Sequence, residues 1–374
     1  MKTKLLPVAL LIAFLLSGCS LFDGQFHRIT PHKMPSSNTV PEAYSAKNYG
    51  ELRVILAERV ASGAESCVIY AEEFPIADLE RAMKDAAHNI RINDPIGAFA
   101  VDEIVYQIGS NNGKTAVAVD IRYRINTMEI RKMKRVEDIN EAIEKILESL
   151  GSCNPGIVFY ITSYQKVDFT QIVEDLAFAN PQTVMEIPRT TENVYGEGSS
   201  RVVELTFSFE TGRDVLRQMQ SQVRPIFDSA VLYVSGDGSD NQKLAQLYAF
   251  LMERFEYSVE TSITPAYSLL RHGVGDSRAF ATVYAAMCRK AGLDCRTVTG
   301  TKMGESWTWN IVRDGDRYYH VDLLQCSAKG HFAEKTDAEM TGYVWDYSAY
   351  PACTGGRTNA APVMGPDLGA EKEF

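Results

Sequence analysis

Several features that would indicate a function at once are missing from this sequence. Only seven cysteines occur in 374 residues, too few for a disulfide scaffold, and none of them has the C-x-x-C spacing of zinc ligands. No P-loop is present, and no G-x-G-x-x-G motif follows a strand pattern. We therefore expect no metal site and no cofactor.

Basic residues are also in deficit. The chain has 38 lysines and arginines against 48 acidic residues, a net charge of −10. Binding of phosphate backbones requires a basic surface, so nucleic acid is not expected as a partner. The sequence does contain 45% apolar and 23% charged residues, the balance of a globular protein, and its length allows two or three domains.

The N-terminus has the pattern of an export signal. Lys2 and Lys4 precede a largely apolar stretch of twelve residues, from Leu5 to Leu16. Spanning a bilayer takes about 20 apolar residues, so this stretch is too short for a transmembrane helix but fits the core of a signal peptide. The following L-S-G-C, which ends at Cys19, resembles the lipobox of bacterial lipoproteins.

That resemblance implies that residues 1–18 are a signal peptide and that the sulfur of Cys19 carries the lipid. The protein would then be extracytoplasmic and attached through Cys19 to the cell membrane, or to an outer membrane if there is one. Alternatives are a plain signal peptide cut elsewhere, or an uncleaved anchor. Residues 19–48 contain prolines and polar residues without an apolar period, which predicts a flexible tether.

Two middle segments, residues 49–135 and 136–235, have the same order of predicted elements, α-β-α-β-β, at an offset of about 86 to 90 residues. We interpret them as tandem modules. Cys67 and Cys153 precede corresponding strands, as buried thiols or as a bridge between the copies. The first copy has a helix near 51–61, a strand at 66–70, a helix at 76–89, and strands near 100–108 and at 115–124. The second has a helix at 136–150, a strand at 156–162, a helix at 169–180, and strands near 190–195 and at 201–210.

The third region, residues 236–354, contains the pieces GVGDSRAFATVYAAMCRKAGLDCRTVTG and ESWTWNIVRDGDRYYHVDLL. Their order of helix and strands resembles the transglutaminase-like family, whose core is shared with papain-like cysteine peptidases. The fold class expected for the whole chain is therefore α+β, with two tandem modules followed by a transglutaminase-like (papain-like) domain. Residues 355–374 are expected to be a mobile tail.

The resemblance also locates the triad of the family, in which a cysteine begins the central helix and a histidine and an aspartate follow on strands. A helix N-terminus lowers the pKa of a thiol, and histidine then moves the proton. The matching positions here are Ser277, Trp307 and Asp322, so only the aspartate is retained. Indole accepts no proton, and a serine hydroxyl needs a neighbouring base.

Alternative roles stay open for these residues. Ser277 is favoured as a simple N-cap, and Trp307 as a core or cleft-filling aromatic, or else a stacking platform for a ligand. His272, across the glycine turn, and His320, two residues before Asp322, are the imidazoles that could replace the missing base. Surface exposure of His272 and structural packing of His320 are the competing interpretations.

Aromatic side chains are frequent near the former triad. Trp307, Trp309 and Tyr267 are candidates to line a cleft, although strands also use aromatics as core. Cys288 lies on the apolar stripe of the helix and is expected to be an inert buried thiol. Cys326 and Cys353 could form a bridge outside the cytoplasm.

We therefore expect an exported protein whose transglutaminase-like domain binds a peptide, protein or glycan ligand without reacting with it. The first alternative is a hydrolase or peptidase with a rearranged site centred on Ser277. The second is a purely structural envelope protein.

Overall fold

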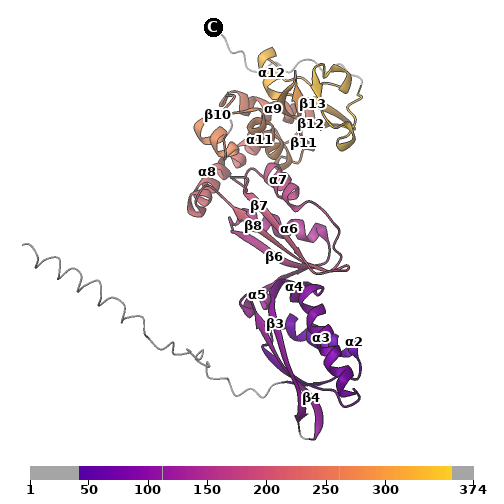
Figure 1. The fold of residues 1–374 in the computed structure, drawn as a ribbon. Coiled ribbons are helices and arrows are strands. Elements are labelled where there is room, and N and C mark those ends of the chain that lie inside the picture. Colours follow the sequence, from indigo (N-terminus) through magenta and orange to yellow (C-terminus); the bar gives the residue numbers. More distant parts are fainter. Residues whose placement is uncertain (1–41, 112, 261, 356–374) are drawn as a thin grey trace, which may run out of the picture. The chain divides into compact units, whose positions relative to one another are not determined.

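The computed structural model describes residues 42–355, except for residues 112 and 261 (Figure 1). The predicted signal peptide 1–18, the lipid-attachment residue Cys19, most of the predicted tether and all but the first residue of the predicted tail lie outside the described residues. Among the described residues, none of the helices combines the length and the hydropathy of a transmembrane span.

The first unit has a four-stranded sheet in the order β1-β2-β4-β3. Leu52, Leu56 and Val60 on α2, at spacings of four, are fully buried and share one core with α3 and the sheet. The helix predicted at 76–89 is present and continues to residue 92. The bounds are β1 Ala43–Ser45, α2 Tyr49–Ala61, β2 Ser66–Tyr70, α3 Ile76–Ile92, α4 Pro95–Ala100, β3 Val101–Asn111, β4 Lys114–Tyr123 and α5 Thr127–Lys132.

The end of the predicted tether differs from the structure. Residues 43–48 were expected to be flexible, but β1 lies beside β2, and Ala46 is only 1% exposed. The backbone N–H of Ala46 donates to the carbonyl of Tyr70 at 2.9 Å. Ladder hydrogen bonds and a buried methyl group therefore fix this part of the chain.

The second unit also has a four-stranded sheet, in the order β5-β6-β8-β7. Along the chain, both sheets are built in the same order. A short edge strand comes first, then a central strand, and then a β-hairpin. The strand predicted at 201–210 is present as β8, and burial alternates along most of it, as in a strand with one face on the core. The bounds are β5 Lys134–Val136, α6 Ile139–Gly151, β6 Gly156–Ile161, α7 Phe169–Ala179, β7 Arg189–Tyr195 and β8 Arg201–Ser208.

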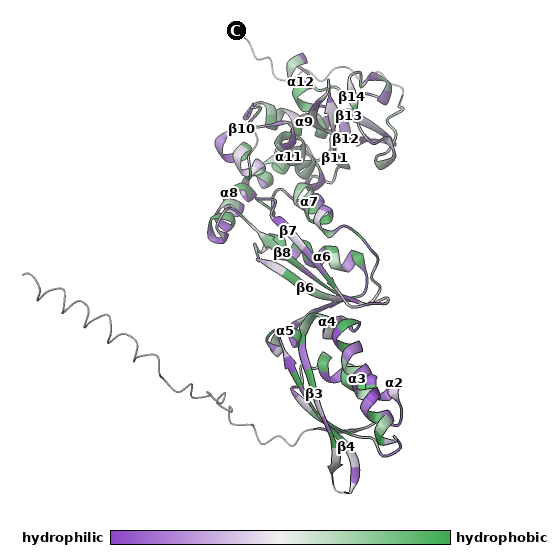
Figure 2. Cartoon of the chain, viewed as in Figure 1, coloured by the Kyte–Doolittle hydropathy of each residue, from purple (hydrophilic) through white to green (hydrophobic). Residues whose placement is uncertain are grey.

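The C-terminal domain has a sheet in the order β13-β12-β11-β14, against which α11 packs. Every residue of α11 from 279 to 288 is buried, and Figure 2 colours much of this helix as apolar. The bounds are α8 Arg213–Leu232, α9 Asp240–Met252, β9 Glu256–Tyr257, α10 Pro265–Tyr267, η2 Ser268–His272, β10 Val274–Gly275, α11 Ser277–Lys290, β11 Cys295–Lys302, β12 Glu305–Asp314, β13 Arg317–Val321, α12 Leu323–Lys329, η3 Asp337–Glu339, β14 Tyr343–Val344 and η4 Tyr347–Ala349.

Helix α8 belongs to the core of this domain, although the boundary predicted at residue 235 assigns it to the second module. Leu216, Val223 and Phe227 are buried in the same cluster as Leu244 on α9 and Phe280 on α11. The apolar face of α8 packs with α9 and α11, and the same cluster also includes Cys153 and Met185 of the second unit.

The six cysteines among the described residues are all buried free thiols. Cys67 and Cys153 are therefore not joined in this structure, and neither are Cys326 and Cys353. Cys288 is 0% exposed, which confirms its prediction as a buried thiol on the apolar stripe of α11.

Candidate functional site

Ser277 begins helix α11 but does not cap it. The N-cap is Asp276, whose carboxylate accepts a hydrogen bond from the N–H of Ala279 at 2.8 Å. The predicted N-cap role of Ser277 is therefore wrong by one residue. The hydroxyl oxygen of Ser277 instead accepts a hydrogen bond from the backbone N–H of Thr308 on β12, at 3.3 Å.

Trp307 and Asp322 contact each other, as the family spacing implies for the histidine and aspartate positions. The indole Nε1–H of Trp307, on β12, donates to Oδ2 of Asp322 at 3.0 Å. The indole donates through its one nitrogen and has no second nitrogen to accept a proton. Trp307 is half-buried and packs against Tyr257 at 5.9 Å between ring centroids.

Asp322 is the most heavily bonded side chain of the site. Its Oδ2 also accepts hydrogen bonds from the ammonium group of Lys302 at 3.0 Å and from the hydroxyl of Tyr343 at 2.5 Å. Its Oδ1 accepts from the N–H of Gln325, because Asp322 is the N-cap of α12. Burial and the carboxylate of Asp322 raise the pKa of Tyr343, so the phenol stays protonated and donates. The carboxylate, only 3% exposed, is satisfied within the protein.

The space beside Ser277 is filled. It is bounded by side chains of α11, β12 and the start of α12, and it leaves essentially no room for a water molecule. Phe280, Trp309 and Leu323 are among the residues that close it. No substrate group can reach the Ser277 hydroxyl through this space unless side chains move.

His320 is buried away from Ser277, with Asp337 rather than Asp322 as its acidic partner. Its Nδ1 accepts a hydrogen bond from Nε1 of Trp309 at 2.9 Å, and its Nε2 lies 2.8 Å from Oδ1 of Asp337. Burial lowers the pKa of His320, whose side chain is 0% exposed. Of the two interpretations of His320, structural packing is the one that these contacts support.

His272 is exposed at the end of η2, where its ring packs edge-on against Tyr267 at 5.3 Å between centroids. Within the described residues, neither His272 nor His320 hydrogen-bonds to Ser277. The structure thus places no proton acceptor of the imidazole type on the Ser277 hydroxyl in the described part of the chain.

His320, Asp337 and Cys353 bring ligand atoms within 4.8 Å of one another, a cluster that their sequence separation did not reveal. Because the indole of Trp309 can only donate, it fixes Nδ1 of His320 as the acceptor and leaves the proton on Nε2. The N–H group at Nε2 points at Asp337, whereas binding a metal there would require a lone pair on Nε2. Burial and the nearby Asp337 raise the pKa of Cys353 to about 12, which also disfavours the thiolate that a metal requires. The cluster suits hydrogen bonding rather than metal binding.

The three aromatic cleft candidates differ in exposure. Trp309 is only 1% exposed and lies in a core cluster with Met340 and Trp345, so its prediction as a cleft-lining residue is wrong. Tyr267 is half-buried, and its hydroxyl donates to Gln222 on α8 at 3.0 Å. The aromatic periodicity of strands does not distinguish core from cleft, since both use the same residue types.

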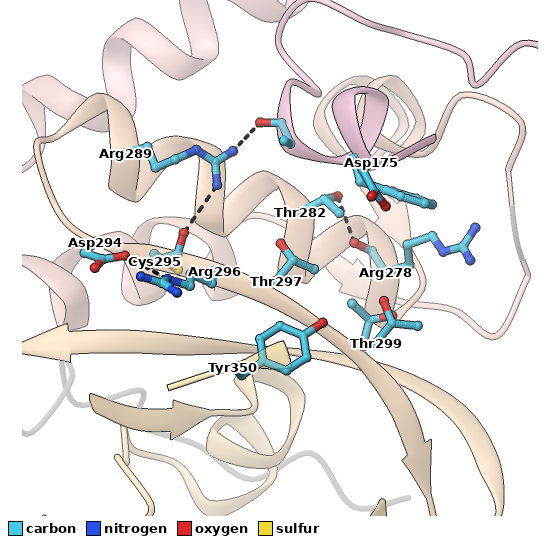
Figure 3. Close-up of a pocket in the computed structure, with 13 residues that line it drawn as sticks. Asp175, Arg278, Thr282, Arg289, Asp294, Cys295, Arg296, Thr297, Thr299 and Tyr350 are labelled. Carbon is cyan, nitrogen blue, oxygen red and sulfur yellow. Dashed lines mark hydrogen bonds and ion pairs between the residues drawn. The ribbon is translucent and has the colours of Figure 1, made fainter. Parts of the chain in front are cut away.

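A pocket of about 550 Å³ lies along the other flank of α11, formed by α7, α11, β11 and β12 (Figure 3). Sequence reasoning missed it. Two signals were present: a cation, Arg278, in the first turn of a helix, and the alternating Thr297 and Thr299 on one face of β11. Thr308 lines both this pocket and the filled space beside Ser277.

Comparisons with known proteins agree with the C-terminal assignment. Residues 229–323 match the model of the transglutaminase-like superfamily, and the matched segment begins within α8. No protein of curated function matches the sequence.

Three solved structures have TM-scores below 0.5, which establish no shared overall fold. The crystal structure of a TGase is 9% identical with a TM-score of 0.26, and the match covers 52% of this chain and 59% of that chain, less than two thirds of its length. A candidate cysteine protease from Cytophaga hutchinsonii is 14% identical with a TM-score of 0.25, covering 42% of this chain and 70% of that chain. A candidate protease from Parabacteroides distasonis is 10% identical with a TM-score of 0.23, covering 69% and 40%. The similarity of residues 229–323 to the transglutaminase-like superfamily therefore rests on the family model alone.

Proposed function

We propose that this protein is a binding module that keeps the transglutaminase-like domain without its covalent chemistry. The observation that carries the proposal is the hydrogen bond from the Trp307 indole to Asp322 at 3.0 Å. It fills the position of the catalytic base with a group that cannot take a proton. The ligand class is a peptide, protein or glycan, in keeping with the substrates of the family.

The loss of the nucleophilic thiol and the loss of the base reinforce each other. A serine hydroxyl is much harder to ionise than a thiol and needs an adjacent base to act as a nucleophile. The neighbour of the Ser277 oxygen is the backbone N–H of Thr308, which donates and does not accept. Loss of nucleophile and base together commonly costs several powers of ten in rate.

The mature protein should turn over neither glutamine peptides with amine donors nor peptide bonds. The comparison is between the wild-type protein and Ser277→Ala, with an active microbial transglutaminase as positive control. Equal background rates are expected, because the Ser277 hydroxyl has no base. The measurement is mass spectrometry of products after prolonged incubation.

Turnover by the wild type that Ser277→Ala abolishes would contradict the binding proposal and favour the hydrolase alternative. Turnover that survives in Ser277→Ala would point to a contaminating enzyme or to a different site. Thermal unfolding of the variant is the control for folding, since the Ser277 oxygen accepts one weak hydrogen bond of 3.3 Å.

A purely structural role is the second candidate, and the filled space beside Ser277 favours it. The pocket of about 550 Å³ on the other flank of α11 argues against it, because this volume lies in the usual range of ligand sites. Ligand binding in the experiments described below would exclude the purely structural candidate.

We also propose that the two N-terminal units are tandem copies that serve as stalk or adaptor modules. Their sheets share one strand order. Their predicted elements recur at an offset of about 86 to 90 residues. The test is to superpose β2, β4 and β3 on β6, β8 and β7. If the superposed residues were separated along the chain by offsets outside about 86 to 90, the duplication would be contradicted.

The N-terminal part of the proposal is a lipid anchor on Cys19 in an extracytoplasmic location. The expected result is incorporation of radiolabelled palmitate into the wild-type protein in a bacterial host and its loss in Cys19→Ala. Membrane fractionation should show the same contrast, because each buried acyl methylene contributes about 0.8 kcal/mol to membrane binding. Unlabelled wild-type protein would contradict the anchor.

A further inference from the structure

We propose that the pocket formed by α7, α11, β11 and β12 binds the carboxylate of a small polar ligand, with Arg278 as the anchor. This inference rests on the proposed binding function and deepens it by naming the ligand class. The pocket holds about 550 Å³, and Figure 3 shows side chains of α11 and β11 along it.

Arg278 is the first observation. Its guanidinium lies over the ring of Phe178 on α7, 4.5 Å from the centroid, and makes no hydrogen bond or ion pair among the residues described. Glu186 lines a neighbouring cavity with Arg278, but its carboxylate accepts from the backbone N–H groups of Glu210 and Thr211 at 2.5 and 3.0 Å. Stacking on one face leaves the N–H edges of the guanidinium free for a bidentate acceptor.

The position of Arg278 in its helix is the second observation. It is the second residue of α11, where the partial positive charge of the helix N-terminus disfavours a cation. The carboxylate of Asp276 at the N-cap already offsets part of this charge. An anion bound to Arg278 would offset more of it, so the helix end makes a modest contribution to the affinity for a negative ligand.

Taken together with Arg278, the charged side chains that line the pocket carry a net positive charge. Three arginines, at 278, 289 and 296, face two aspartates. Both carboxylates are engaged: Asp294 accepts from the hydroxyl of Tyr318 at 3.0 Å and pairs with Arg296, and Asp175 accepts from the amide of Gln171 at 2.9 Å.

Arg289 forms hydrogen bonds with both walls of the pocket. Its guanidinium donates to the carbonyl of Ala179 at the end of α7 and to the carbonyl of Cys295 at 3.3 Å. These bonds appear as dashed lines in Figure 3. The wall that carries Phe178 is therefore held beside α11 and preorganises the cation–π contact of Arg278.

Hydroxyl groups supply the rest of the recognition surface. Thr299 on β11 and Thr308 on β12 are directly opposite each other, and Thr297 lies on the same face of β11. Among the described residues, the hydroxyls of Thr297, Thr299 and Thr308 have no hydrogen-bond partner. Tyr350 adds an aromatic ring with its hydroxyl turned into the pocket (Figure 3). Such a lining suits a monoanion rich in hydroxyl or amide groups, such as a sugar acid or a short peptide with a free C-terminus.

The experiment is titration calorimetry of the full-length protein in non-ionic detergent at pH 7. The probes are N-acetyl-L-alanyl-L-alanine and D-glucuronate, each compared with a neutral counterpart, the dipeptide amide and D-glucose. We expect one carboxylate probe to bind at least tenfold more tightly than its neutral counterpart, and the two arms tell a peptide source from a sugar source. Arg278→Gln should weaken that binding at least tenfold, as expected for loss of a charge-assisted hydrogen bond.

Arg271→Gln is the matched control, because it removes the same charge from an exposed position six residues from Ser277 and should leave binding unchanged. Thr299→Val, which keeps the shape and β propensity of the side chain, should weaken binding severalfold and covers the case in which Arg278→Gln fails to fold. Absence of binding by either carboxylate probe, equal binding of the neutral counterparts, or wild-type affinity in Arg278→Gln would overturn the inference. None of these results concerns turnover at Ser277. The turnover experiment therefore tests the proposed function separately.

Discussion

Asp322→Ala should lower the free energy of unfolding of the C-terminal domain by about 3 to 5 kcal/mol, the usual cost of removing one partner of a buried ion pair. The variant leaves the ammonium group of Lys302, the indole of Trp307 and the hydroxyl of Tyr343 without their acceptor. It also removes the N-cap of α12, a contribution of about 1 kcal/mol by itself. Few other single changes in this domain would orphan so many donors at once.

The measurement is urea unfolding followed by tryptophan fluorescence. All three tryptophans of the chain lie in the C-terminal domain, at positions 307, 309 and 345, so the signal reports this domain alone. Asp322→Asn should cost less than alanine, because an amide oxygen can still accept and cap the helix, although the charge opposite Lys302 is lost.

Asp316→Ala is the control, since Asp316 is fully exposed and its ion pair with Arg313 spans 3.9 Å. It should change stability by less than about 0.5 kcal/mol. If Asp322→Ala lowered the free energy of unfolding by less than about 1 kcal/mol, the hydrogen bonds of Asp322 would not be important for stability.

The resemblance to the transglutaminase-like family aligns Trp307 and Asp322 with two positions of one triad, which implies that they lie close together. Two antiparallel strands that follow a buried helix bring the end of one strand beside the start of the other, so residues at the family spacing meet. The sequence could not locate the N-cap of α11 to the exact residue. Asp276 and Ser277 are both favourable capping residues, and helix starts are uncertain by a residue.

Other features lay beyond the sequence for reasons of topology. The apolar face of α8 shows that the helix is buried but not which core it fills, and it packs with the domain that follows it. The partner of His320 is Asp337, which reaches it from beyond α12. The pocket at Arg278 depends on the position of α7, an element about 100 residues earlier in the chain.

Glu334→Gln should stabilise the domain at pH 8 and have little effect near pH 4.5. Burial, together with the charge of Asp314, raises the pKa of Glu334 from 4.5 to about 7, against a smaller opposing effect of Asn241. Its Oε1 is buried without a hydrogen-bond partner in the described residues. Glutamine keeps the shape of the side chain and removes the charge.

The sign follows from proton counting. Between pH 4.5 and about 7 the folded protein keeps a proton on Glu334 that the unfolded chain has lost, so stability falls as the pH rises through this window. Above about pH 7 the whole cost of ionising the buried carboxyl is present, up to about 3 kcal/mol for a shift of this size. The variant should regain that energy at pH 8, whereas Glu305→Gln, an exposed control on β12, should change stability equally little at both pH values. A difference between wild type and Glu334→Gln that is the same at pH 5 and pH 8 would show that Glu334 is ionised in the folded protein throughout this range.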